Sequence, residues 1–435
     1  MSNRLRFLLR YMFSGIVIVF LPVYTGIIFL IALFNYVQNR KDLRFVWGPD
    51  PLINNIYWSR AMRRAGYISE TFTYSYYRKL NNREDWGVLL QEKYSYLKFL
   101  SLKQYVAFLE ALIKYDIFVI PFSGFFLGST PLWRLESFFF RLCKKKVIVI
   151  PYGGDSYVYR NIRSTITLQG LLMSYPYMSR NQERISKRVK YWCKNADVVI
   201  TGFMGVDGFG RWDVLVPNPI VIDINAWRKS NRNSIADGRN DTVYIAHAPN
   251  HHGVKGSEFI IDAISNLKND GLKVELILIE HKKNDEVRKI LEEEADILVD
   301  QLIISGHGLN AIEGMAVGIP TISNLENNDD IQLFRYWTYF DECPLVSASP
   351  ETITENLRKL VTQPKLRHLL GTAGRQYVEK YHSMDSAQYL FGEIIEYFYG
   401  RRDSLINLYH PILGEYNKRK PMIKHPLVKN HINNQ

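Results

Sequence analysis

Cysteine and metal-binding motifs are scarce in this chain of 435 residues. The three cysteines lie far apart in the sequence: Cys143, Cys193 and Cys343. Such spacing excludes a disulfide framework and a cysteine-rich zinc site, and it favours a reducing compartment. No Asp-x-Asp motif occurs, and the pairs His251-His252 and Asp329-Asp330 are more typical of a turn and a surface loop than of metal ligands. We therefore expect no metal and no other cofactor.

Acidic residues are also few relative to basic ones. Lys and Arg number 55 against 43 Asp and Glu, which gives a formal net charge of +12. This balance favours anionic partners, namely phosphate-bearing ligands, anionic lipid or nucleic acid. No nucleic-acid-binding module is recognisable, so we expect no nucleic-acid partner. Hydrophobic residues make up 47% of the chain, which excludes wholesale disorder and predicts a large core.

Charged residues are absent from positions 11–39, where the chain is a long apolar run interrupted by Pro22. About 20 apolar residues suffice to cross a bilayer as a helix, so residues 1–41 are predicted to form a transmembrane anchor. A cleaved secretory signal is the alternative, but the run is too long and no small-residue cleavage site follows it. The basic residues on the two sides nearly balance, namely Arg4, Arg6 and Arg10 before the run and Arg40, Lys41 and Arg44 after it. Flanking charge therefore leaves the orientation open.

Strand and helix patterns alternate along the rest of the chain. Short apolar runs predict strands at 43–47, 67–74, 117–121, 147–151, 197–201, 242–246, 273–279, 297–300 and 320–322. Because helical patterns separate these strands, we predict two Rossmann-like, doubly wound α/β domains that face a central cleft. The domains are expected at 42–220 and 242–385, with a linker at 221–241 and a C-terminal helix and basic tail at 386–435 that crosses back to the first domain.

Residues 247–257 form the first of two glycine-containing segments in the second half. They follow a predicted strand and open a helix, and Lys255 stands between Gly253 and Gly256. Free N–H groups beside a lysine suit a diphosphate. The alternative is a glycine turn with a solvated lysine, and the spacing alone does not decide between the two.

Residues 305–323 form the second segment. A loop with Gly306 and Gly308 enters a short helix, and Glu313 lies in that helix among small and apolar residues. A carboxylate in such surroundings faces a polar cleft or finds partners, so Glu313 is a candidate to accept hydrogen bonds from ribose hydroxyls. The N–H groups of Gly308 and Leu309 would then approach a diphosphate. An exposed glutamate on an amphipathic helix is the alternative.

A basic helix is predicted at 180–194 in the first half. Ile185, Val189 and Trp192 form one apolar stripe, and most of the remaining surface is basic. Such a helix packs its stripe on the sheet and leaves its basic face in solvent, or it attracts anionic lipid or a lipid-diphosphate acceptor.

The second half resembles the nucleotide-binding domain of GT-B glycosyltransferases, in particular the large retaining group called family 4. That group carries a Glu-x7-Glu segment, which is matched here by Ser305, Gly306, His307 and Gly308 followed by Glu313-Gly314-Met315-Ala316, Gly318 and Pro320. Residues 373–387 resemble the family's C-terminal helix region. The first half matches more loosely, through residues 47–67 and through Pro151–Ser156, which is similar to the family's H-G-x-D segment.

The resemblance implies a metal-independent, retaining hexosyltransferase. Such an enzyme moves a sugar from a nucleotide-diphosphate donor to a glycan, glycolipid or lipid-linked acceptor, here in cell-surface polysaccharide synthesis. By resemblance the donor would contact Lys255, Gly256, Ser305, Gly306, His307, Gly308, Leu309 and Glu313. Asp155 and Lys255 would be catalytic, and the acceptor side of the cleft would include Gly48, Tyr152 and Gly153. A cytosolic donor favours a single-pass protein of the bacterial inner membrane with cytoplasmic catalytic domains, and a lumenal eukaryotic placement stays open.

Two departures from the family pattern keep other functions open. Ser305 replaces the first glutamate of Glu-x7-Glu, and Tyr152 replaces the histidine before Gly-x-Asp. Neither replacement is charged at neutral pH. A non-catalytic, membrane-tethered scaffold or binding subunit is therefore one alternative. A nucleotide-sugar epimerase, which can share the two-domain architecture, is another.

Overall fold

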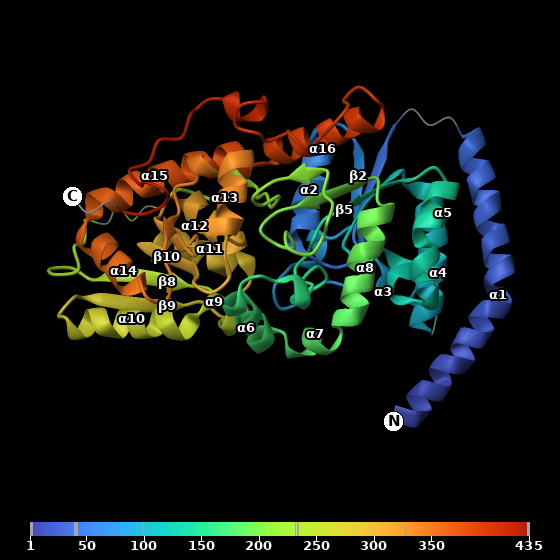
Figure 1. Cartoon of the computed structure of the whole chain (residues 1–435), viewed down its shortest axis with the longest axis horizontal. Helices are drawn as coiled ribbons and strands as arrows, with labels where there is room; N and C mark the ends of the chain where they lie inside the picture. Colours follow the sequence, from blue (N-terminus) through green and yellow to red (C-terminus); the bar gives the residue numbers. More distant parts are fainter. Residues whose placement is uncertain are drawn as a thin grey trace.

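The computed structural model describes residues 3–38, 42–97, 99–230, 232, 235–326 and 328–432. Two α/β lobes lie side by side, and one long N-terminal helix runs along the outer side of the first lobe (Figure 1). This helix, α1, spans Asn3–Val37. The lobes correspond to the two halves in which strand and helix patterns alternate in the sequence.

The first lobe is built on a parallel sheet, which within the described residues has seven strands in the order β3-β2-β1-β4-β5-β6-β7. The strands are β1 Arg44–Trp47, β2 Ile68–Thr73, β3 Val88–Leu89, β4 Ile117–Ile120, β5 Lys146–Val149, β6 Val198–Thr201 and β7 Val214–Leu215. The helices are α2 Ile53–Arg64, α3 Leu90–Lys93, α4 Leu100–Lys114, α5 Glu136–Leu142, α6 Thr165–Ser174, α7 Pro176–Arg180 and α8 Gln182–Asn195. Helices cover both faces of this sheet, as its apolar strands require.

The second lobe contains a smaller parallel sheet, with five strands among the described residues in the order β12-β11-β10-β8-β9. The strands are β8 Val243–His247, β9 Val274–Leu278, β10 Ile297–Gln301, β11 Thr321–Ser323 and β12 Val346–Ser347. The helices are α9 His252–Lys255, α10 Ser257–Asn269, α11 Asn284–Glu293, α12 Leu309–Val317, α13 Asn328–Trp337, α14 Ile353–Thr362, α15 Pro364–Tyr381 and α16 Met384–Phe398.

Each sheet contains one point at which the strand order reverses. In the first lobe this point lies between β1 and β4, and in the second lobe it lies between β8 and β10. The connections to the two neighbouring strands leave toward opposite faces there, which opens a crevice at the carboxyl ends of the strands. Both glycine-containing segments of the second half begin at its reversal point, directly after β8 and just after β10.

The C-terminal helix α16 joins the lobes by packing on α2 of the first lobe. The ring of Phe391 meets Trp47 edge to face at 4.8 Å between centroids, and Gln388 Nε2 donates to the carbonyl of Ala61 at 2.9 Å. The chain then returns over the second lobe, where the N–H of Ser347 donates to the carbonyl of Asn430 at 2.8 Å. The basic tail is thus packed against the second lobe, and the connection at 221–241 includes the buried residue Trp227.

Helix α1 contains the one segment of the described residues that is long and apolar enough to cross a membrane, Phe20–Val37. Most of this segment is exposed in the structure. Length and composition alone support a membrane role, so the crossing stays a prediction. Arg40 and Lys41, which entered the comparison of flanking charge, lie outside the described residues.

Candidate functional site in the cleft

The turn after β8 is held by side-chain hydrogen bonds at both of its ends. His247 ends β8, and its ring lies 2.8 Å from both the carbonyl of Val299 and the hydroxyl of Ser257. Lys255 ends α9 and is buried; its ammonium donates to the carboxylate of Asp300 and, at 3.2 Å, to Gln301 Oε1. The predicted diphosphate-binding lysine is therefore paired with a carboxylate, and it is not solvated.

Asp300 connects this lysine to the second glycine-containing segment. It lies near the end of β10 and is fully buried, and its Oδ2 accepts a hydrogen bond from the Gly308 N–H at 2.8 Å. A Cβ at Gly308 would stand 3.6 Å from the Lys255 ammonium. Gly306 has φ +94°, and a Cβ there would come within 2.3 Å of the ring of Phe203. The loop therefore requires glycine, and it lies directly against the buried ion pair.

Glu313 lies inside α12 and is also buried. Its Oε1 accepts a hydrogen bond from Asn284 Nδ2 at 2.9 Å. The pKa of Glu313 is raised to about 8, chiefly by burial and in part by the Asp300 carboxylate, while the Asn284 hydrogen bond and Lys255 act in the opposite direction. Asn284 begins α11 and lines a pocket between the lobes together with Tyr57 of α2. Glu313 is therefore buried, and its hydrogen bond to Asn284 connects it to the pocket between the lobes.

His307, in the same loop, has its ring in an aromatic cluster. The ring stacks on Phe340 and meets Phe203 and His382 edge to face. Neither ring nitrogen has a hydrogen-bond partner within the described residues, and burial lowers the pKa of His307 to about 4. Its carbonyl accepts from Asn218 Nδ2 at 2.9 Å. The imidazole therefore packs as an uncharged ring, and the main chain anchors the loop to the first lobe.

Gly48 follows β1 at the reversal point of the first sheet. A Cβ at this position would come within 2.1 Å of the Phe72 carbonyl oxygen, so only glycine fits. The loop that follows β5, two strands along this edge, contains Tyr152, Gly153 and Asp155. The Tyr152 hydroxyl donates to Asn55 Oδ1 at 2.8 Å, which ties this loop to α2.

Asp155 connects the loops that follow β4 and β5. Its Oδ2 accepts from the Phe122 N–H at 2.8 Å, and its Oδ1 accepts from the Tyr152 N–H at 2.9 Å. Burial raises the pKa of Asp155 to about 7, the two N–H bonds lower it, and the Asp50 carboxylate raises it. The group thus changes charge near neutral pH while it holds two loops together.

Asp50 and Asp300 are the residues of these two edges that sequence reasoning missed. Asp50 accepts a hydrogen bond from Ser123 Oγ at 3.3 Å, and burial raises its pKa. Both residues stand at or just beyond the end of a buried strand next to a reversal point. That position, together with the charge, was the signal that could have identified them.

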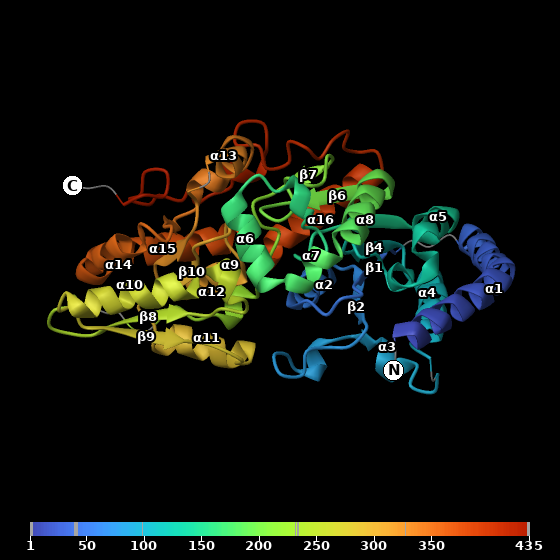
Figure 2. The same cartoon turned by 60° about the horizontal axis from the view of Figure 1, so that its bottom comes forward.

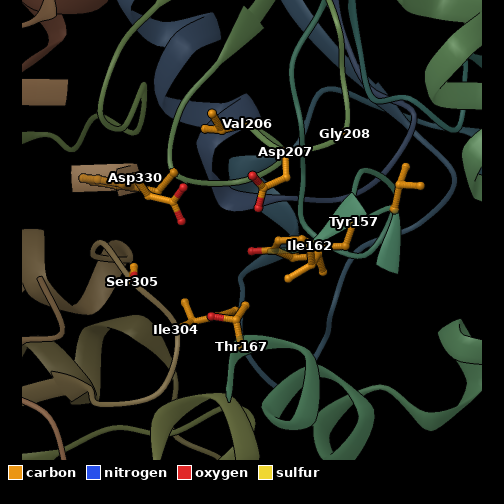
Figure 3. A pocket seen from close by; sticks show the side chains of 12 residues that line it. Tyr157, Ile162, Thr167, Val206, Asp207, Gly208, Ile304, Ser305 and Asp330 are labelled. Carbon is orange, nitrogen blue, oxygen red and sulfur yellow. The ribbon is translucent and has the colours of Figure 1, made fainter. Parts of the chain in front are cut away.

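Ser305 lines a pocket between the lobes, where it faces carboxylates from both (Figure 3). Asp207 comes from the first lobe and Asp330 from α13 of the second. The Arg163 guanidinium bridges them, at 2.8 Å from Asp207 Oδ1 and 3.2 Å from Asp330 Oδ1. Asp330 therefore contributes to the cleft and does not lie in a surface loop. Within the part of the chain that the structure describes, no group of three or more His, Cys, Asp or Glu side chains could hold a metal ion.

No family model and no curated protein matches this chain. Among solved structures, sucrose-phosphate synthase from Thermosynechococcus elongatus is 15% identical, with a TM-score of 0.52 over 83% of this chain and 100% of its own. A glycosyltransferase from Rickettsia africae is 11% identical, with a TM-score of 0.46 over 83% and 100%. A protein described as a putative UDP-N-acetylglucosamine 2-epimerase from Listeria monocytogenes is 9% identical, with a TM-score of 0.44 over 82% and 97%.

At these identities a likeness concerns the fold alone, and only the first reaches a TM-score above 0.5. It confirms the predicted class, which is two α/β domains with parallel sheets in the GT-B arrangement. Membership of family 4 and the roles of the site residues stay predictions.

Proposed function

We propose that this protein is a glycosyltransferase that moves a sugar from a nucleotide-diphosphate donor to a glycan, glycolipid or lipid-linked acceptor. One observation carries the proposal. Asp300, at the reversal point of the second sheet, has Lys255, the Gly308 N–H and Glu313 around it. The resemblance to GT-B glycosyltransferases implies donor binding at this place. The first lobe supplies a titratable carboxyl, Asp155, at its own reversal point.

The donor diphosphate would bind at the start of α12. The N–H groups of Gly308 and Leu309 stand at the N-terminal end of that helix, which attracts anions. In the structure, the Asp300 carboxylate accepts hydrogen bonds from the Lys255 ammonium and from the Gly308 N–H. An incoming diphosphate would compete with this carboxylate, and it would receive both donors already in position. Leaving-group charge would be stabilised by these donors without a metal.

The ribose would bind beside Glu313. A carboxyl with a pKa of about 8 is mostly protonated at neutral pH, so it can donate one hydrogen bond and accept another from a sugar hydroxyl. The acceptor would enter from the first lobe, past Gly48, Tyr152 and Gly153, toward Asp155. Retention of anomeric configuration is part of the proposal and rests on the resemblance to family 4.

Attachment to a membrane through α1 completes the proposal. The segment Phe20–Val37 supports it by length and composition. A lipid-linked acceptor would then be presented at the membrane surface, and the net charge of +12 favours anionic lipid. We place the protein at the bacterial inner membrane with both lobes in the cytoplasm, where nucleotide sugars are made.

The test is donor binding and sugar transfer by the full-length protein across a panel of nucleotide sugars and membrane-derived acceptors. We expect Glu313→Ala to weaken donor binding at least about tenfold, because a hydroxyl partner worth about 1.5 kcal/mol is removed. Glu258→Ala, at an exposed glutamate of α10, is the matched control and should bind as wild type does.

The outcomes separate the alternatives. Nucleotide binding without turnover for any donor or acceptor supports the non-catalytic subunit, which the departures at Ser305 and Tyr152 favour. Interconversion of sugars in the absence of an acceptor supports an epimerase. If wild type binds no nucleotide and transfers no sugar, the proposal is wrong.

A further inference from the structure

Helix α1 is docked along the first lobe. The Tyr24 hydroxyl donates to the carbonyl of Tyr105 at 3.0 Å, and Asn35 Nδ2 donates to the carbonyl of Leu112 at 3.0 Å. Both carbonyls belong to α4, so α1 and α4 run side by side in the same direction over this stretch (Figure 2). Ile28 is fully buried between them, and its carbonyl lies 3.8 Å from Cys143 Sγ after α5.

The docked face of α1 is narrow and regular. It consists of residues at helical spacing: Leu21, Tyr24, Ile28, Ile31 and Asn35. The remainder of the segment is apolar but exposed, namely Phe20, Val23, Ile27, Phe29, Leu30, Leu33, Phe34, Tyr36 and Val37. A continuous apolar surface of this size indicates an interaction site. The helix is therefore apolar toward the lobe and apolar toward the outside.

The neighbouring helices extend this outer surface. Phe99 at the N-cap of α4, and Leu102 and Ile113 within it, are exposed. Phe138 of α5 is 47% exposed, and the adjacent residue Phe139 meets Tyr24 edge to face. We call α1 residues 20–37 and these exposed side chains of α4 and α5 the apolar flank.

The edge of the apolar flank is basic. Arg134, Arg141 and Lys144 are exposed beside α5. Lys144 lies 4.1 Å from the ring centroid of Tyr36, at the end of α1. Cations around an apolar surface match an anionic lipid bilayer, in which phosphate groups surround the acyl chains.

Crossing the bilayer is difficult for a helix docked in this way. A crossing through the segment Phe20–Val37 would place about 30 Å of hydrocarbon around the part of α1 that is docked on the lobe. Helix α4 would enter with them, and it carries Lys103, Glu110 and Lys114 while its inner face belongs to the core of the lobe. Charged side chains at that depth cost several kcal/mol each.

We propose that α1 lies along the membrane surface, between the first lobe and the lipid, and that the apolar flank enters one leaflet. Both ends of the described chain then stay on the same side of the membrane. The proposal rests on the membrane attachment proposed above, and it replaces a single pass through the bilayer with attachment to one leaflet.

The first test is the topology of the full-length protein. Single cysteines introduced as Asn3→Cys and Ser404→Cys are treated with a membrane-impermeant maleimide in sealed inner-membrane vesicles of both orientations. The native cysteines are buried and serve as an internal blank. We expect both sites to react from the same side. Reaction from opposite sides means that α1 crosses the membrane and overturns the proposal.

The second test measures depth with a nitroxide label at Phe138→Cys, in vesicles of phosphatidylethanolamine and phosphatidylglycerol. The control is Ile412→Cys in the C-terminal tail, which replaces another exposed apolar side chain, 77% exposed and outside the apolar flank. We expect oxygen to reach the label at 138 more readily than a nickel chelate does, and the reverse at 412. Equal accessibility at the two sites places α5 outside the lipid and overturns the proposal.

These tests do not depend on sugar transfer, so their failure leaves the proposed reaction intact. A protein recovered entirely in the soluble fraction would overturn both this proposal and the membrane part of the proposed function.

Discussion

The two lobes share a strand arrangement around their reversal points, but they surround their carboxylates differently. In the second lobe, the buried Asp300 carboxylate is paired with the Lys255 ammonium. In the first lobe, Asp155 is held by two main-chain N–H groups and has another carboxyl, Asp50, close enough to raise its pKa. The same edge of the same kind of sheet thus carries an opposite-charge pair in one lobe and a like-charge pair in the other.

This difference gives the two lobes distinct chemical environments at the same edge of the sheet. The Asp300 carboxylate accepts from both Lys255 and the Gly308 N–H, so another anion such as a diphosphate would have to replace it there. A like-charge pair moves one carboxyl toward neutrality, which is what proton transfer needs. Four substitutions test this difference between the lobes.

Lys255→Met should have the largest effect on stability. It leaves Asp300 buried without a counter-charge, and breaking a buried pair in this way costs about 3–5 kcal/mol. The measurement is the free energy of unfolding in urea. Asp300→Asn in the same chain should recover a large part of the loss, because the uncompensated charge is then gone.

The control for this pair is Lys268 with Glu275, whose side chains are about half exposed. Lys268→Met should cost less than about 1 kcal/mol, as exposed ion pairs do. If the Lys255 and Lys268 variants lose equal stability, the second lobe has no buried charge pair of the kind described here.

Asp155→Asn should reduce the rate of sugar transfer on the order of 10²-fold, the lower range for loss of a general base. In wild type, the rate should rise with pH through about 7, because the pKa of Asp155 lies there and the anion is the active form. The variant should lose this rise and keep its affinity for the donor. A pH profile that is unchanged in the variant would assign the proton transfer to another group.

Glu313→Gln should stabilise the protein at alkaline pH. The pKa of Glu313 is raised to about 8 in the folded protein, so its stabilising contribution is complete below about 4.5 and is lost as pH rises through 8. Glutamine stays neutral, so the variant's melting temperature should exceed that of wild type by about 2–4 °C at pH 9. At pH 4, below the unfolded pKa, the two should agree, and a constant difference across pH would contradict burial as the cause.

Gly170→Ala should have the smallest effect, and it concerns the contact between the lobes. Gly170 of α6 lies against α9 of the second lobe; a Cβ there would come within 2.7 Å of Ile303 Cγ2 and 3.1 Å of the Gly253 carbonyl. We expect a loss of about 1 kcal/mol in unfolding free energy from overpacking. Gly392→Ala in α16 meets nothing within 4 Å and should instead be neutral or stabilising, since alanine is the better helix former.

Much of the architecture could be predicted from the sequence. Strands expected at 117–121 and 147–151 are observed at Ile117–Ile120 and Lys146–Val149. Such runs are recognisable because a parallel strand buried on both faces must be continuously apolar. Gly306 and Gly48 were also identifiable, since close approach of the main chain excludes any side chain at those positions.

The partners of the site residues could not be predicted in the same way. Lys255 pairs with Asp300, which is 45 positions away in the sequence. The sequence pattern predicts only that Asp300 lies in a strand. Asp155 owes its pKa to burial and to Asp50, more than 100 positions away. Local patterns report on neighbours in the chain, whereas charge pairing and desolvation depend on which loops meet at the edge of a sheet.

The succession of strands and helices, the positions that must be glycine, the excess of positive charge and an apolar segment near the N-terminus can all be read from the amino-acid sequence. Folding in three dimensions is what pairs Lys255 with Asp300, raises the pKa of Asp155 to about 7 and lays the apolar segment against the first lobe. The physical reason is that main-chain conformation follows from local sterics and hydrophobic spacing. Electrostatic free energy instead depends on distance and burial, which exist only once the chain has folded.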